Sequence, residues 1–310
     1  MITNSEPQSR KNPLSPGILW LWRRLPVVIR AVISGLLLAA SGTIPWAILV
    51  SANSKHITAL PWAVVPTALY LWLWWRLASG VGRPGSSAEA RRRLCRANSL
   101  SANVWGIAIV AGVLGVATVV LLQSVMTRLV NLPQQQDVDV TQFSHVTLVF
   151  WVLMGAVVAG VVEETAFRGY MQGPIERQHG PIIAILVTGG LFGFAHFTHP
   201  EVGLILLPYY LAVAAVYGAL AYLTNSILPS LVLHAAGNIM GAFALFTRGA
   251  SEWQASSSPP RLIWETGPDT AFLITLISFI CLGIGAIAAY AALAKAARKS
   301  AGFPGSQTSS

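Results

Sequence analysis

The chain has 310 residues, of which 54% are hydrophobic and only 10% are charged, and its formal net charge is +9. Soluble domains carry about 25% charged residues, so the composition excludes a soluble protein and indicates a membrane protein. The basic residues flank apolar runs, as they do in membrane proteins, and this placement argues against a nucleic-acid partner. Cys95 and Cys281 lie in unlike surroundings without paired spacing and predict neither a disulfide nor a cysteine metal site.

Eight apolar stretches are long enough to cross a hydrocarbon core, which needs about 20 helical residues. The first is preceded by GILWLWRRL, residues 17 to 25, whose tryptophans and arginines suit the membrane interface. The sequence therefore predicts an all-α fold, a polytopic membrane helical bundle of about eight transmembrane helices. In chain order the stretches are 27–52, 58–77, 101–125, 146–170, 181–198, 203–223, 227–246 and 270–294.

Lysine and arginine are concentrated in the N-terminal tail, in the loop after the second span and in the C-terminal tail. The positive-inside rule places these three segments on one side of the membrane and predicts that both termini are cytoplasmic. We divide the chain into a tail and interfacial segment (1–26), a transmembrane bundle (27–298) and a polar tail (299–310), with the tails expected to be largely disordered. Abundant Ala, Gly, Arg and Trp suit a bacterial plasma membrane.

Apart from Arg30 and Arg76 near the ends of the first and second spans, five ionisable residues lie inside the predicted spans: Glu163, Glu164, Arg168, His196 and His234. A charge at the bilayer centre costs about 2.5–3.5 kcal/mol on insertion scales, so these side chains need partners or a water-filled cavity. They occupy three helices, and we expect the three helices to converge on one polar pocket. Glu164 and Arg168 have the spacing of an ion pair on one helix face, which leaves Glu163 without an intrahelical cation.

The pocket predicts hydrolytic chemistry, for which two alternatives are open. Glu163 with His196 can activate a water, while His234 and Asn238 can donate hydrogen bonds to an oxyanion. Alternatively, Glu163, His196 and His234 form the ligand set of a catalytic zinc ion with an open position for water. A serine or cysteine nucleophile is not indicated, because no such residue has a suitable base and no GxSxG elbow occurs.

The predicted spans place Glu163 and His196 at different depths. Glu163 lies slightly to the cytoplasmic side of its helix midpoint and His196 lies toward the opposite end of the next helix, about 10–15 Å away at 1.5 Å per residue. We therefore expect either that residues 174–182 dip into the membrane or that the helices are strongly tilted.

Three short motifs in order carry a resemblance to a known family. EETAFRG (163–169) fits EExxxR, FGFAH (192–196) fits FxxxH, and HAAGN (234–238) fits HxxxN. The chain resembles the CAAX protease and bacteriocin-processing family of intramembrane proteases (CPBP, or Abi), over about residues 145–245. The resemblance implies a catalytic glutamate (Glu163), a supporting pair (Glu164 and Arg168), a water-activating partner (His196) and an oxyanion-stabilising or metal-associated pair (His234 and Asn238).

The resemblance implies an intramembrane endopeptidase, similar to the CAAX prenyl proteases, that acts on a membrane-associated peptide or protein. No cofactor is required by this reading, although a divalent metal such as zinc stays an alternative. A second hypothesis is a catalytically silent scaffold or immunity protein that binds partner membrane proteins. A proton-coupled transporter is the third, and it is disfavoured because no inverted repeat is evident.

Overall fold

The computed structural model describes residues 16–131, 142–196, 200–248 and 261–300. These residues form helices and no strand, as the all-α prediction requires. The elements are α1 (Pro16–Arg24), α2 (Val27–His56), α3 (Val64–Ala78), the 3₁₀ turn η1 (Gly85–Ser87), α4 (Ala88–Cys95), α5 (Ala102–Leu129), α6 (His145–Glu163), the π-helical segment η2 (Glu164–Gln172), α7 (Gly173–His179), α8 (Pro181–Ala195), α9 (Pro200–Thr224), α10 (Leu228–Arg248), α11 (Ile263–Thr266) and α12 (Thr270–Ser300).

Each of the eight predicted spans coincides with a helix. Five stretches of the described chain are both long and apolar enough to cross a membrane, namely 27–56, 102–129, 145–179, 203–224 and 270–300. The protein is therefore a multi-pass membrane protein. The count of eight spans and the cytoplasmic location of the termini stay predictions, and the outer parts of both predicted tails (1–15 and 301–310) lie outside the described residues.

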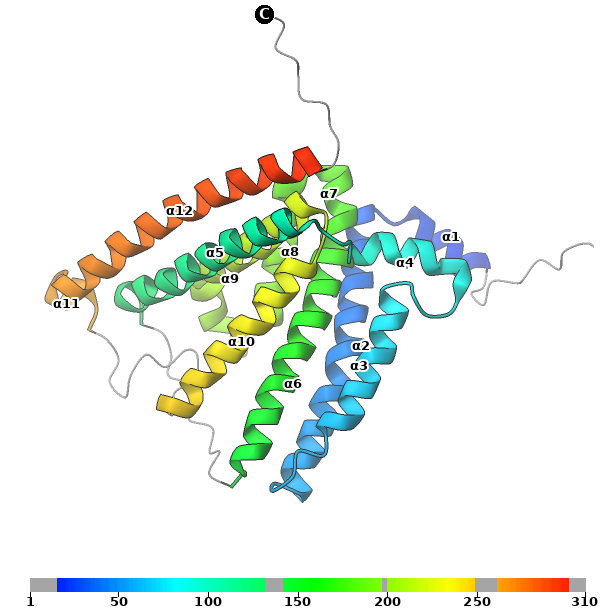
Figure 1. Ribbon diagram of the computed structural model, residues 1–310, viewed down its shortest axis with the longest axis horizontal. Helices are drawn as coiled ribbons and strands as arrows, with labels where there is room; N and C mark the ends of the chain where they lie inside the picture. Colours follow the sequence, from blue (N-terminus) through cyan, green and yellow to red (C-terminus); the bar gives the residue numbers. More distant parts are fainter. Residues whose placement is uncertain (1–15, 132–141, 197–199, 249–260, 301–310) are drawn as a thin grey trace, which may run out of the picture.

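The helices are arranged around α6 (Figure 1). Helices α2 and α3 pack on one side of α6 and α10 packs on the other, while α12 lies along α5. Helices α8 and α9 pack against each other and against η2. Large apolar side chains such as Leu37, Leu186 and Ile274 are exposed on the outside of the bundle, as lipid contact requires.

Helix α6, η2 and α7 form one continuous helical rod from His145 to His179. The Ser144 hydroxyl accepts the backbone N–H of Thr147 and so caps its start. Gly180, with φ +83°, ends the rod and Pro181 begins α8. We predicted that this span ends at residue 170, but the rod continues for nine more residues, to His179. Residues 174–179 are part of the rod and do not form a separate segment that dips into the membrane.

Arg96 joins three segments that are distant in sequence. It follows α4 in the left-handed conformation (φ 58°) and is only 4% exposed. Its guanidinium donates to both carboxylate oxygens of Glu176 in α7, at 3.2 and 3.3 Å, and to the carbonyl of Ala221 in α9 at 2.8 Å. A further bond reaches the Asn225 side chain at 3.2 Å. The arginine thus fixes the loop after α4 to the end of the rod.

Replacing Arg96 tests this connection. Arg96→Ala leaves the Glu176 carboxylate, itself only 12% exposed, without its cation, and removing one partner of a buried pair costs about 3–5 kcal/mol. We expect a lower melting temperature of the detergent-solubilised protein. The matched control is Arg93→Ala, because Arg93 pairs with Glu89 on the open surface and its loss changes stability by only about 0.5 kcal/mol. Equal melting temperatures for the two variants would contradict the assignment.

Candidate active site

A buried carboxylate, Glu164, lies at the centre of the polar cluster. Its side chain is fully buried at the start of η2, and the Arg168 Nε lies 3.5 Å from its Oε2, so the ion pair expected from the spacing is present. Its Oε1 lies 2.8 Å from Nδ1 of His234 in α10. A buried carboxylate between two such partners is ionised, and the imidazole therefore donates its Nδ1–H to it.

Glu163 approaches the same imidazole from its other nitrogen. Its Oε2 lies 3.8 Å from Nε2 of His234, and its side chain is 19% exposed, whereas that of Glu164 is fully buried. Glu163 has no intrahelical cation, as the spacing predicts, but α10 brings the imidazole of His234 next to it. The two glutamates thus hold one histidine between them, and Glu163 is the more exposed of the two, although its Oε2 is itself buried.

His196 is brought to the level of Glu163 by the hairpin of the rod and α8. Phe167 of η2 contacts Phe192 of α8 edge to face, with ring centroids 5.2 Å apart. Phe167 follows Glu163 by four residues, and Phe192 precedes His196 by four residues. Because the rod and α8 run antiparallel, a contact between the two phenylalanines places Glu163 opposite His196. The extension of the rod to His179 therefore removes the offset in depth that the predicted boundaries gave.

His196 follows the last residue of α8, and its side chain is exposed. Its Nδ1 lies 2.8 Å from the Phe192 carbonyl oxygen, which fixes the ring and leaves Nε2 for another partner. Among the described residues no hydrogen bond or ion pair joins His196 to Glu163, so their cooperation on a water stays a prediction. Asn238, one turn after His234, is partly buried and has no hydrogen bond to another described residue.

The metal hypothesis fits these positions poorly. Within the described ranges, no three His, Cys, Asp or Glu side chains converge as a metal site requires. We therefore derive no catalytic step through a metal ion. Burial raises the pKa of the Cys95 thiol to about 12, which also removes this residue as a nucleophile.

Aromatic rings enclose Arg168. Its guanidinium carbon lies 4.9 Å from the ring centroid of Phe192 and 5.6 Å from that of Tyr217, and the side chain is 1% exposed. None of its three nitrogens has a hydrogen-bond partner among the residues that the structure describes, where the charge is balanced by Glu164 and by the two ring faces. The sequence analysis did not identify Tyr217, which lies in α9 outside the three motifs.

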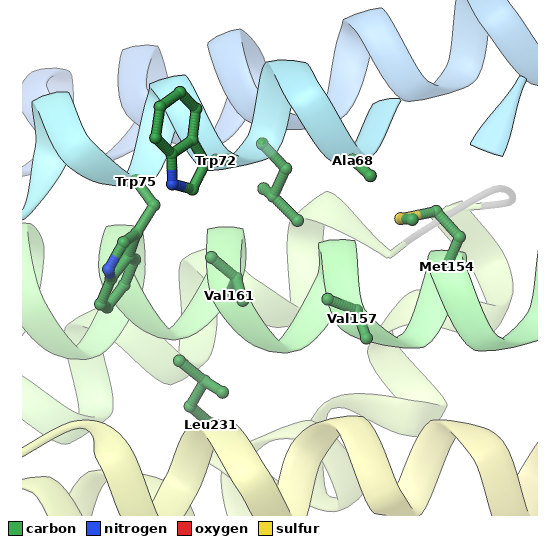
Figure 2. Close-up of a pocket in the computed structure, with 8 residues that line it drawn as sticks. Ala68, Trp72, Trp75, Met154, Val157, Val161 and Leu231 are labelled. Atoms are coloured by element: carbon green, nitrogen blue, oxygen red, sulfur yellow. The ribbon is translucent and has the colours of Figure 1, made fainter. Parts of the chain in front are cut away.

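An apolar cavity of about 330 Å³ lies between α3 and α6 (Figure 2). Trp72 and Trp75 line it from α3, Val157 and Val161 from α6, and Leu231 from α10. No ionisable side chain lines it, so this cavity suits a hydrocarbon group and not the hydrolytic chemistry.

A close approach of α6 and α10 brings the glutamates to His234. Gly160, one turn before Glu164, packs against α10 so tightly that a Cβ atom would lie 2.9 Å from the Leu231 carbonyl oxygen and 3.0 Å from the Ala235 Cβ. The backbone of α10 cannot yield as a flexible side chain would. Glycine at this position therefore sets the separation of the two helices that carry the cluster.

Gly160→Ala tests this close approach. Although alanine favours helix by about 1 kcal/mol over glycine, overpacking costs about 1–3 kcal/mol, so we expect lower thermal stability and displacement of His234 from the glutamates. Gly155→Ala on the same helix is the control, because its Cβ would meet only the Trp46 ring at 3.7 Å. Melting temperatures in detergent provide the measurement. A Gly160→Ala protein as stable as the control would show that the helices are free to separate.

One family model matches the region of the chain that contains the three motifs. Residues 145–240, which include all three motifs, match the family model described as Type II CAAX prenyl endopeptidase Rce1-like. No curated protein and no solved structure matched the chain. The matched region contains α6, η2, α7, α8, α9 and the part of α10 that carries His234 and Asn238. The segment 145–240 of this chain is therefore similar to the Rce1-like type II CAAX prenyl endopeptidases.

Proposed function

We propose that this protein is an intramembrane endopeptidase that hydrolyses a peptide bond of a membrane-associated peptide or protein. The observation that carries the proposal is the arrangement around His234. Glu163, whose side chain is 19% exposed, faces one nitrogen of the ring through its buried Oε2, while the other nitrogen is held by Glu164, the buried partner of Arg168. Water, a base and hydrogen-bond donors are the requirements of amide hydrolysis without a covalent nucleophile.

In the proposed reaction Glu163 accepts a proton from a water molecule that His196 helps to orient. The water oxygen attacks the peptide carbonyl carbon and forms a tetrahedral intermediate with an oxyanion. His234, donating from Nε2 when doubly protonated, and Asn238 stabilise that oxyanion. The intermediate collapses as the C–N bond breaks, and Glu163 returns its proton to the leaving amine.

Glu164 and Arg168 support this chemistry without touching the substrate. Glu164 fixes the orientation of the imidazole through Nδ1, so Nε2 faces Glu163. Arg168 neutralises Glu164, which lowers the cost of the buried carboxylate and leaves Glu163 as the base.

The substrate class follows from the family and from the apolar cavity. The name of the matched family refers to prenylated CAAX substrates. Two residues that line the cavity, Val161 and Leu231, precede Glu163 and His234 by two and three positions. We propose that a hydrocarbon chain on the substrate, or an apolar stretch of it, occupies this cavity during cleavage.

Glu163→Gln tests the proposed base. The amide keeps the shape of the side chain but accepts no proton, and general-base catalysis contributes about 10²–10⁴-fold, so we expect a loss of that size in kcat. Cleavage of a fluorogenic prenylated CAAX peptide by protein in proteoliposomes is the measurement. Glu89→Gln, which changes an exposed carboxylate in α4, is the control. Full activity of Glu163→Gln would sink the mechanism and favour a scaffold or immunity role.

Chelation separates the two hypotheses for activating water. Because the described side chains do not assemble three ligands, we expect that prolonged dialysis against EDTA leaves cleavage by the reconstituted protein within about twofold of the untreated rate. Elemental analysis before and after dialysis shows whether a metal was present and removed. Loss of activity that zinc restores would overturn the metal-free mechanism while leaving the endopeptidase proposal intact.

A further inference from the structure

Helix α9 carries none of the three motifs, yet it contacts both motif histidines. Tyr210 and Tyr217 lie seven residues apart, which places them two turns apart on one face of the helix. Both side chains are buried, with exposed fractions of 5% and 6%. Each tyrosine ring packs on a different histidine.

Tyr217 forms a parallel stack with His234. The ring centroids are 5.3 Å apart and the planes differ by 8°, so the phenol covers one face of the imidazole. The same ring faces the Arg168 guanidinium at 5.6 Å. The imidazole is held at Nδ1 by Glu164. The stacked phenol also opposes rotation of the ring about its Cβ–Cγ bond.

The ring of Tyr210 packs against the imidazole of His196. Its ring centroid lies 5.3 Å from that of the imidazole with planes 33° apart, and Phe192 lies on the same imidazole at 4.4 Å. Since His196 follows the last residue of α8, little of the helix itself restrains its side chain. The Phe192 carbonyl holds Nδ1, while the Phe192 and Tyr210 rings restrict the plane of the imidazole.

We infer that Tyr217 and Tyr210 are positioning residues that set the ring planes of His234 and His196, so that α9 aligns the two histidines across one site. The inference rests on the proposed endopeptidase function. The aromatic faces are what the geometry uses, because these two tyrosine–histidine contacts are made by the rings. A ring held in the wrong plane misdirects its Nε2, and a misplacement of about 1 Å can cost about 10²-fold in rate.

The first experiment compares Tyr217→Leu and Tyr217→Phe in the proteoliposome assay. We expect that leucine lowers kcat about 10- to 100-fold with KM within about twofold, whereas phenylalanine, which keeps the stack, stays within about threefold of the parent. Tyr210→Leu and Tyr210→Phe should behave in the same way. Leucine variants with the parent kcat, or phenylalanine variants as slow as the leucine variants, would overturn the inference.

Tyr290→Leu controls for loss of packing. Tyr290 of α12 joins the same apolar cluster as Tyr217 and its hydroxyl donates to the Val216 carbonyl, but it contacts neither histidine. We expect that Tyr290→Leu lowers the melting temperature about as much as Tyr217→Leu without lowering kcat. A similar fall in kcat for both would show that Tyr217 acts only through stability.

A second measurement does not need activity. In protein labelled at histidine and held in nanodiscs, the ring resonances of His234, assigned by their loss in His234→Gln, should form one sharp set in the parent and in Tyr217→Phe. Tyr217→Leu should broaden or multiply them. If no substrate is cleaved but Tyr217→Leu alone broadens the His234 resonances, the proposed endopeptidase function fails and the positioning role of Tyr217 is supported. If cleavage occurs and the resonances are unchanged in Tyr217→Leu, the positioning inference fails alone.

Discussion

The buried carboxylate of Glu164 determines the arrangement of the site. Its side chain has no exposed surface, so its charge must be balanced by protein groups within contact distance. Arg168 supplies a cation from the same segment and His234 supplies a donor from α10. Satisfying Glu164 therefore draws α10 against the rod, where Gly160 allows the backbones to meet. Glu163 is then next to the same imidazole, but it has no arginine partner as Glu164 has in Arg168.

The two adjacent glutamates reach one ring at the point where the π-helical segment begins. In an α-helix, neighbouring side chains diverge by about 100°. The wider turn of η2 begins at Glu164, and the two carboxylates face opposite nitrogens of His234. Such widened turns are frequent at functional sites. All nine residues of η2 are buried, so packing holds this less favourable geometry in place.

The sequence predicted the membrane helices and the convergence of the charged residues because both follow from the cost of polarity in hydrocarbon. It did not predict the full length of the rod, because Gln172, Glu176 and Arg177 resemble the polar end of a span. Arg96 was expected to be one of several basic loop residues, whereas it is buried on Glu176. Tyr217 was missed because an aromatic residue in an apolar helix has no distinguishing local pattern. These features depend on contacts between segments that are distant in sequence.

The N-terminal helices are needed to shape the family region, although the match begins only at residue 145. In α2, a Cβ on Gly35 would lie 2.7 Å from the Met171 Cε, and one on Gly42 would lie 2.5 Å from Val162. A Cβ on Gly169 of η2 would lie 2.9 Å from the backbone carbonyl oxygens of Leu94 and Cys95, at the end of α4. The rod that carries the glutamates is therefore enclosed by α2 and α4 on one side and by α9 and α10 on the other. Residues 145–240 alone lack half of this enclosure, so the geometry of the site is a property of the whole bundle.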